Sequence, residues 1–317
     1  MSSVMSGEAT PAQLGALLAA MHVRGETVDE IAGFATALRD AAVHVVAPAD
    51  AIDTCGTGGD RSNTFNISTV AAIVAAAAGA HVAKHGNRAA SSACGSADVL
   101  EALGVTIDLG PSDVVACLGE VGLGFMFAPR FHPAMRHAAP VRRELGIRTV
   151  FNVLGPLANP ARVRRQLLGV PTPALGGTMA RVLSILGAEK ALVVHGRGAL
   201  DEISPVGPTM TWEVAGGEVR EGTLSPEDAG LTPAPLEELR GGDPAANAAI
   251  ARRVLGGEPG AARTAVLLNA GAALYVADLA ASVRHGAALA ATAIDSGAAA
   301  ERLARFVSTT ERLAVAA

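Results

Sequence analysis

From about residue 50 onward, short apolar runs rich in β-branched residues alternate with alanine-rich stretches. This alternation limits the fold more than any other feature, because strands joined by crossover helices produce it, and it predicts a wound α/β domain. Helices are expected at residues 70–78, capped by Ser68 or Thr69, and at residues 97–103, capped by Ser96. The expected strands are residue 52 and residues 81–83, 106–109, 124–127, 191–194 and 264–269.

Two further segments have the apolar spacing of helices. Residues 11–46 are expected to form a small helical module. A stretch at about residues 132–144 interrupts the α/β pattern, and we expect it to pack with that module. Residues 216–244 are rich in glycine, proline and acidic residues, which predicts a surface excursion.

Composition restricts the possible functions. Of the 317 residues, 50% are apolar and 17% are charged, which suffices for a large core and favours two unequal domains. A formal net charge of −5 and only 3% aromatic residues argue against a protein that binds nucleic acid. Three cysteines without a CxxC pair indicate neither a zinc site nor a disulfide framework and fit a reducing cytoplasm. No apolar run reaches the roughly 20 residues of a membrane span, so no membrane segment is expected.

Residues 53–104 contain a glycine-rich loop, GTGGD, with an apolar run on each side. Because glycine has no Cβ, the backbone at Gly56, Gly58 and Gly59 can bring its N–H groups close to an anion. The loop matches neither the Walker nor the Rossmann glycine pattern. Hydroxyl and amide groups precede the next predicted helix, whose N-terminus favours an anion, at Thr64, Asn66, Ser68 and Thr69. The segment therefore predicts a phosphate site rather than a simple connecting turn.

The segment VAKHGNR ends a predicted strand where ligands of open α/β sheets bind. Lys84 is either a point charge for a phosphate or a solvated surface lysine, and the neighbouring glycines and serines favour the first. His85 is either a general base or a histidine packed in a βα turn. Asn87 offers donors and an acceptor to a small polar substrate. Three serines continue this surface towards a second helix start, namely Ser91, Ser92 and Ser96.

Two charged groups lie outside this segment. Arg142, in the second helical stretch, can clamp a carboxylate bidentately or be an ordinary solvated charge. Asp201 and Glu202 follow the strand expected at residues 191–194. Adjacent carboxylates suit Mg²⁺, which commonly joins carboxylates to substrate phosphates, although an acidic turn has the same composition.

These residues lie in longer strings that resemble the anthranilate phosphoribosyltransferase family, a branch of the nucleoside phosphorylase and phosphoribosyltransferase-like proteins. The strings occur in order between about residues 10 and 310, and they are DTCGTGGD, TFNIST, VAKHGNRAASS, GSADVLEALG, FHPAMRHAAPVRRELGIRTVFNVLGPLANP and DEIS. The resemblance implies an α/β protein: a small N-terminal helical domain beside a larger α/β domain whose mixed, mainly parallel central sheet is flanked by helices. The implied bounds are residues 1–48 with a helical insertion at about 132–165, and residues 49–131 with 166–317. A homodimer that contacts through the helical domain is also implied.

In that family, the amine of anthranilate attacks C1 of the ribose of 5-phosphoribosyl 1-diphosphate (PRPP), the second step of tryptophan biosynthesis from chorismate. Such a transfer needs a neutralised leaving group and a well-placed amine more than a strong base. We therefore expect no dedicated acid or base, but electrostatic and positioning roles for Lys84, Asn87 and Arg142.

The resemblance assigns three sets of ligands. The implied PRPP ligands are Gly56, Gly59, Asp60, Thr64, Asn66, Ile67, Ser68, Thr69, Lys84, His85, Gly86, Asn87, Arg88, Ser91, Ser92 and Ser96. The implied anthranilate ligands are Gly56, Asn87, His132, Arg142 and Pro156. The cofactor is expected to be Mg²⁺, held by Ser68, Asp201 and Glu202.

Two residues and one turn depart from the family pattern without removing an expected ligand. Arg61 follows GTGGD where glycine is frequent, and the turn HGRGAL precedes Asp201 where an acidic-glycine pair is more frequent. Cys94 stands where many relatives have serine, and we expect it not to be a nucleophile.

Two alternatives fit the sequence less well. A pyrimidine-nucleoside phosphorylase would have a Lys-His-Ser-Thr-Gly-Gly type of phosphate motif, which is missing. A non-catalytic relative that binds nucleic acid would be expected to carry a basic face, whereas this chain is acidic and retains Asp201 and Glu202.

Overall fold

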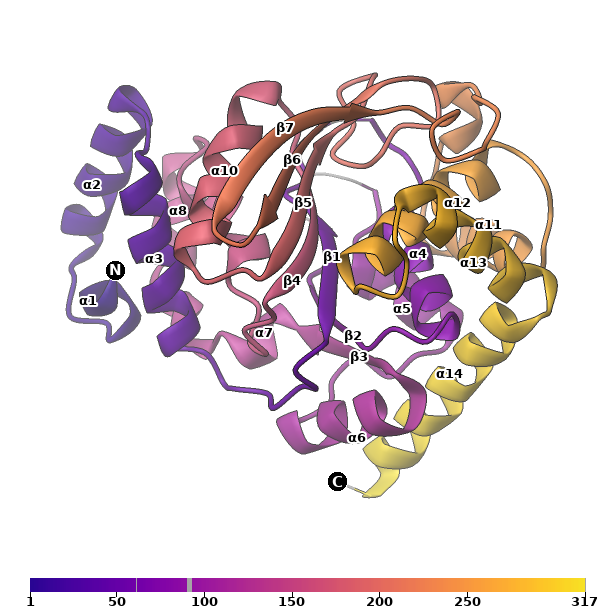
Figure 1. Cartoon of the computed structure of the whole chain (residues 1–317). Coiled ribbons are helices and arrows are strands. Elements are labelled where there is room, and N and C mark those ends of the chain that lie inside the picture. Colours follow the sequence, from indigo (N-terminus) through magenta and orange to yellow (C-terminus); the bar gives the residue numbers. More distant parts are fainter. Residues whose placement is uncertain (61, 90–92, 317) are drawn as a thin grey trace.

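A seven-stranded sheet forms the centre of the computed structural model, which describes residues 1–60, 62–89 and 93–316 (Figure 1). The strands are β1 (Ile52–Gly56), β2 (Val82–Gly86), β3 (Leu123–Phe127), β4 (Arg165–Gly169), β5 (Lys190–His195), β6 (Thr209–Ala215) and β7 (Glu218–Leu224). Their order is β3-β2-β1-β4-β5-β6-β7. The first five strands of the chain run parallel, and β6 and β7 are antiparallel additions at one edge. The expected mixed, mainly parallel sheet is confirmed.

The strand order reverses direction at β1. The chain proceeds from β1 outward to β2 and β3, and then returns to place β4 on the other side of β1. The loops that leave β1 and β4 therefore diverge, and a crevice opens at their carboxyl ends, where ligands of such sheets bind. The glycine loop after β1 lies at this point of the fold.

Helices cover both faces of the sheet. On one face, α4 (Ile67–Ala77) lies against β1 and β2 and is itself covered by α12 (Ala261–Val276) and α14 (Ala298–Ala316). Because α4 is enclosed on all sides, its residues from Thr69 to Ala76 are all buried, and the segment is almost entirely apolar. The other helices of this region are α5 (Ser96–Leu103), α6 (Pro111–Val121), α11 (Pro244–Leu255) and α13 (Val283–Asp295). On the opposite face, α10 (Pro173–Ile185) packs on β5 and β6.

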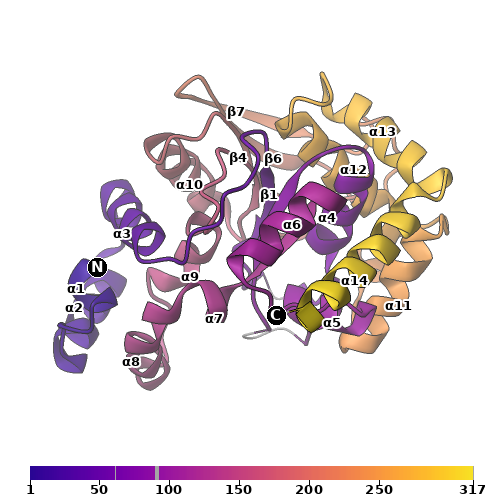
Figure 2. The ribbon, with the colours of Figure 1, turned by 90° about the horizontal axis from the view of Figure 1, so that it is seen from below.

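The N-terminal helices α1 (Ser2–Met5), α2 (Pro11–Arg24) and α3 (Val28–Asp40) lie together on one side of the molecule (Figure 2). Capping boxes begin α2 at Thr10 and α3 at Thr27, where a Gln or Glu three residues later completes each box. The mid-chain helices are α7 (Ala128–Phe131), η1 (Pro133–His137), α8 (Ala139–Leu145), α9 (Phe151–Leu154) and η2 (Gly155–Leu157). Because α2 contacts α8, α1 contacts η1 and α3 contacts α9, the expected packing of the mid-chain stretch on the N-terminal helices is confirmed.

Two expected strands are wrong. Residues 264–269 lie within α12, where the apolar run is buried on all sides of a helix, a situation that periodicity does not distinguish from a buried strand. Residues 106–109 are irregular. Their alternate side chains are buried, but the N–H of Thr106 donates to Oγ1 of Thr310 on α14 at 3.1 Å instead of to a neighbouring strand.

The helix caps and the excursion also differ from expectation. The N-caps of α4 and α5 are Asn66 and Gly95 rather than Ser68, Thr69 or Ser96. Residues 216–244 include β7, whose exposed, charged residues pair with β6 through a turn at Gly216 and Gly217, both with positive φ. Among the described residues, no helix is both long and apolar enough to span a membrane.

Candidate functional site

The acidic pair lies where the strand order reverses. Gly58 donates its N–H to Oδ2 of Asp201 at 2.6 Å, and Ser68 donates its N–H to Oε1 of Glu202 at 3.1 Å. Two hydrogen bonds thus tie the loop after β5 to the glycine loop after β1 and to the first turn of α4. The structure thus brings the carboxylates of Asp201 and Glu202 to the glycine loop and to the backbone of Ser68.

Close packing explains the glycines beside this pair. A Cβ on Gly56 would lie 2.2 Å from Oδ2 of Asp201, and a Cβ on Gly169 would lie 1.6 Å from the carbonyl oxygen of Asp201. Neither distance is compatible with any side chain. The carboxyl ends of β1 and β4 must therefore carry glycine for the Asp201 carboxylate to reach the crevice.

The electrostatics of the pair suit a divalent cation. Burial raises the pKa of Asp201, and the charge of Asp60 raises it further. Burial and the neighbouring Asp201 raise the pKa of Glu202, while the charge of Lys84 lowers it. The raised pKa values mean that ionising both carboxyl groups costs free energy. A hard cation that prefers oxygen ligands stabilises the ionised form of such a pair.

The donor set fits Mg²⁺ rather than an ion enclosed by protein. Within the described part of the chain, no group of three or more His, Cys, Asp and Glu side chains is arranged to hold a metal ion. Mg²⁺ usually takes one or two carboxylates and completes its shell with water and substrate phosphates. The two carboxylates of Asp201 and Glu202, with the Ser68 hydroxyl nearby, match that requirement.

Lys84 is not a surface lysine, since the residue is only 3% exposed. Its Nζ donates to the carbonyl oxygen of Thr54 on β1 and to Oγ of Ser68 at 3.4 Å. The ammonium group therefore lies between the carboxyl end of β1 and the start of α4. This position supplies a fixed positive charge at the base of the predicted anion site.

The glycine loop combines positive φ angles with polar side chains. Gly58 and Gly59 have φ of 73° and 81°, which side chains rarely tolerate. Asp60 accepts hydrogen bonds from the N–H and hydroxyl of Ser62 at 3.1 and 2.6 Å. Thr64 pairs with Arg240 in an isolated β-bridge. Arg61, which departs from the family pattern, lies outside the described residues.

Asn66 was expected to bind PRPP, but both polar atoms of its side chain contact protein. Its Nδ2 donates to the carbonyl oxygen of Cys94 at 3.1 Å, and its Oδ1 accepts from Nδ2 of Asn247 at 2.9 Å. Asn247 is buried on α11 and was not singled out from the sequence. Ile67 and Thr69 are buried, and Oγ1 of Thr69 has no hydrogen-bond partner among the described residues.

The carboxyl end of β2 meets the start of α5. A Cβ on Gly86 would lie 2.2 Å from Oγ of Ser96. The carbonyl oxygen of Asn87 accepts from that hydroxyl at 3.3 Å, which leaves the exposed Asn87 amide beside the turn. Arg88 is paired with Asp98 at 3.0 Å and with Glu101, so its charge is already neutralised by protein. Ser91 and Ser92 lie outside the described residues.

Two buried histidines, His85 on β2 and His132 just after α7, contact each other edge to face. The rings of His85 and His132 have centroids 5.0 Å apart, and Nδ1 of His85 lies 3.2 Å from the carbonyl oxygen of Gly155. The Nε2 atoms of both rings are buried and have no hydrogen-bond partner among the described residues. Burial lowers the pKa of His85 to about 3 and that of His132 to about 4. Both imidazoles are therefore neutral near pH 7.

Arg142 is a half-buried cation without an acidic partner. It lies on α8, and its guanidinium is 4.9 Å from the ring centroid of Phe151. Burial lowers the pKa of Arg142, and among the described residues its guanidinium makes no hydrogen bond or ion pair. Pro156 is buried in η2, and its carbonyl oxygen accepts from Nε2 of Gln166 at 2.7 Å. An unpaired guanidinium beside an aromatic ring can bind an aromatic carboxylate.

A buried hydrogen-bond network that the sequence analysis missed joins β1 and β2 to the η2 segment. Nδ2 of Asn159 donates to Oδ2 of Asp53 at 2.8 Å and to the carbonyl oxygen of Ala83 at 2.9 Å. Asp53 and Asn159 are 0% and 1% exposed. The only signal in the sequence is an aspartate within an apolar strand, beside the glycine loop.

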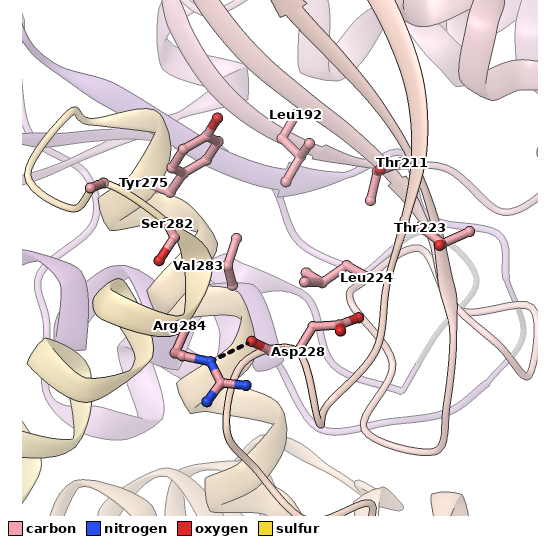
Figure 3. A pocket seen from close by; sticks show the side chains of 10 residues that line it. Leu192, Thr211, Thr223, Leu224, Asp228, Tyr275, Ser282, Val283 and Arg284 are labelled. Atoms are coloured by element: carbon pink, nitrogen blue, oxygen red, sulfur yellow. Dashed lines mark hydrogen bonds between the residues drawn. The ribbon is translucent and has the colours of Figure 1, made fainter.

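A cavity of about 450 Å³ lies elsewhere, between β5 to β7 and helices α12 and α13 (Figure 3). Tyr275, Leu192 and Val283 line it, and at its rim Nε of Arg284 donates to the carbonyl oxygen of Asp228 at 2.9 Å. None of the site residues expected from the sequence lines this cavity. It is therefore not the site formed at the reversal of strand order.

Comparisons with known proteins place these features in a family. The model of the glycosyl transferase family a/b domain matches residues 48–300, and that of the helical bundle domain of the same family matches residues 1–42. The anthranilate phosphoribosyltransferase of Roseiflexus castenholzii is 58% identical over 97% of this chain and 91% of its own length.

Two solved structures are similar over nearly the whole chain. The anthranilate phosphoribosyltransferase of Thermus thermophilus superimposes with a TM-score of 0.93 at 49% identity, covering 98% of this chain and 93% of that one. The enzyme of Saccharomyces cerevisiae in complex with PRPP and Mg superimposes with a TM-score of 0.88 at 31% identity, covering 96% of this chain and 86% of that one.

Proposed function

This chain belongs to the anthranilate phosphoribosyltransferase family, and we propose that it transfers the 5-phosphoribosyl group of PRPP to the amine of anthranilate. Diphosphate is released, and the reaction is the second step of tryptophan biosynthesis from chorismate. The observation that carries the proposal is the pair of hydrogen bonds from Gly58 and Ser68 to Asp201 and Glu202. They join the glycine loop, the start of α4 and the acidic pair in one crevice, in a chain 58% identical to an enzyme of this name.

The donor side binds PRPP around the glycine loop. The backbone N–H groups of the loop and the N-terminus of α4 bind the phosphates, and the buried Lys84 contributes positive charge from below. The ligands we propose from the described residues are Gly56, Gly59, Asp60, Thr64, Ile67, Ser68, Thr69, Lys84, His85, Gly86, Asn87, Arg88 and Ser96. We assign Asn66 to this group as a residue that positions the loop, because its amide already contacts Cys94 and Asn247.

Asp201 and Glu202, with the hydroxyl of Ser68, would hold Mg²⁺. When bound, the ion neutralises part of the negative charge of the diphosphate. The protein's own contribution is to hold both carboxylates at the crevice through the N–H groups of Gly58 and Ser68. The bond between C1 and the diphosphate oxygen breaks as the amine nitrogen bonds to C1, and the nitrogen then loses one proton to water. A site that stabilises the departing anion therefore accelerates the step.

The acceptor side binds anthranilate. Arg142 binds its carboxylate, and Gly56, Asn87, Pro156 and the neutral ring of His132 surround the rest of the molecule. The amine of anthranilate is uncharged near pH 7 and needs no prior deprotonation. Positioning is therefore the main requirement on this side.

We also propose a cytoplasmic homodimer that contacts through the helical domain, residues 1–48 with the insertion at about 132–165. The support is an apolar exposed face on α2, where Leu17 and Val23 are 42% and 86% exposed. Light scattering after gel filtration measures the mass of the particle. A particle of monomer mass would contradict the dimer.

Steady-state kinetics test the assignment of the two substrate sides. The Arg142→Ala variant should raise KM for anthranilate about 10- to 100-fold, because it loses a charge-assisted pair, and should leave KM for PRPP unchanged. The Asp201→Ala, Glu202→Ala double variant should instead weaken the use of Mg²⁺ and PRPP. Arg143→Ala is the control, since Arg143 is exposed on the same helix. The opposite pattern of phenotypes would overturn the assignment.

A further inference from the structure

Arg148 approaches the glycine loop from the segment that joins α8 to α9. Its Nη1 lies 3.1 Å from the position that a Cβ would take on Gly59. The guanidinium therefore lies over a residue that has both a positive φ and no side chain. A Cβ at position 59 would make the guanidinium shift by a few tenths of an ångström.

The guanidinium of Arg148 has no partner within the protein. It makes no hydrogen bond or ion pair with any residue that the structure describes, and the residue is exposed. The side chain is exposed to solvent, but it extends along the glycine loop and places its guanidinium beside Gly59. The position is therefore suited to an anion that arrives from outside the protein.

Acidic side chains dominate the surroundings of the glycine loop. Asp60, Asp201 and Glu202 bring three carboxylates to the crevice, before any phosphate binds. Lys84 is enclosed beneath the loop and is 3% exposed. Arg88 is paired with two acidic residues, and the guanidinium of Arg142 stacks on Phe151.

We propose that Arg148 binds the diphosphate group of PRPP and stabilises it as the leaving group. The inference rests on the proposed function and adds a ligand that the sequence resemblance did not assign. A guanidinium matches phosphate oxygens bidentately, and a cation placed where negative charge develops lowers the barrier of the transfer. Because Arg148 belongs to the mid-chain helical segment, donor binding also fixes this segment against the glycine loop.

The test compares Arg148→Ala, Arg148→Lys and the control Arg143→Ala by steady-state kinetics. The first variant should lower kcat/KM for PRPP about 100-fold, as the loss of one electrostatic donor does, with KM for anthranilate unchanged. The lysine variant should lie between the alanine variant and the wild type, because it keeps the charge and loses the bidentate geometry. The thermal unfolding temperature should not change, since Arg148 has no partner among the described residues of the folded protein.

Calorimetric titration with magnesium diphosphate provides a readout that does not depend on turnover. Arg148→Ala should bind about 10-fold more weakly than Arg143→Ala. Equal diphosphate binding and equal kcat/KM for PRPP in these two variants would overturn the inference. If the wild type does not use anthranilate, the proposed function fails, and the diphosphate titration still decides the role of Arg148.

Discussion

The Asn159→Ala substitution should destabilise the protein strongly, although Asn159 is not a substrate ligand. In the wild type, its Nδ2 donates hydrogen bonds to Oδ2 of Asp53 and to the carbonyl oxygen of Ala83. Its Oδ1 accepts a hydrogen bond from the N–H of Ala161 at 2.8 Å. Alanine removes all three interactions. Asp53 and Ala83 are both 0% exposed, so water cannot replace the lost amide without local opening of the structure.

The magnitude follows from the partners that are left. Each buried polar group without a hydrogen bond costs about 1–3 kcal/mol, and two fully buried partners with one less buried give about 3–5 kcal/mol in total. Burial already raises the pKa of the Asp53 carboxyl, and the Asn159 amide is one of the interactions that lower it. Loss of the amide therefore makes ionisation of Asp53 still less favourable.

Urea unfolding followed by circular dichroism measures the effect as a shift of the urea concentration at the midpoint of unfolding. The matched control is Asn152→Ala in the same segment, where an exposed side chain accepts a single hydrogen bond from the N–H of Thr149 at 2.9 Å. That control should cost about 1 kcal/mol or less. Equal shifts for the two variants would refute the argument that the Asp53–Asn159 network holds the η2 segment on the sheet.

Three other changes have definite outcomes. Because burial lowers the pKa values of His85 and His132 to about 3 and 4, both rings should stay neutral in the folded protein between pH ~7 and ~5.5, where the unfolded chain takes up protons, and together they should remove about 2–3 kcal/mol from the free energy of unfolding. The raised pKa values of Asp201 and Glu202 act in the opposite direction over the same range, so a nuclear magnetic resonance titration of the two imidazoles measures the effect of the rings separately. Resonances of His85 and His132 that titrate near pH 6.5 in the folded protein would contradict neutral buried rings. Gly56→Ala should displace the Asp201 carboxylate, 2.2 Å from the new Cβ, and weaken Mg²⁺ binding in a calorimetric titration; wild-type affinity would contradict the packing argument. Cys94→Ser should retain wild-type kcat, because Cys94 is buried with its pKa raised to about 11; a folded variant without activity would make this thiol a nucleophile after all.

The sequence predicts those parts of the site that lie in short motifs next to a predicted strand. The glycine loop and Lys84 each follow or end a parallel strand, so a single rule about carboxyl ends places them at one edge of the sheet. The same rule brings Asp201 there from more than 140 positions away, as its hydrogen bond to Gly58 confirms. Burial of Lys84 was not predictable, because it depends on how tightly α4 lies on β1.

The misses have identifiable physical causes. The run at residues 264–269 is buried on all sides of α12, so hydrophobicity has no period there. The polar hairpin strand β7 is mostly exposed and lacks the apolar alternation that indicates a strand. Asn159 and Arg148 act through contacts with residues far away in the sequence, and no local pattern distinguishes such residues from ordinary turn or surface residues.

The central claim is tested most directly by measuring substrate consumption and diphosphate release together. The purified protein is mixed with Mg²⁺, PRPP and anthranilate, and the loss of anthranilate fluorescence is compared with the diphosphate formed. We expect one diphosphate for each anthranilate consumed, and no reaction when PRPP is omitted or Mg²⁺ is removed by a chelator. Anthranilate fluorescence that stays constant in the complete mixture, with a folded protein, would contradict the account.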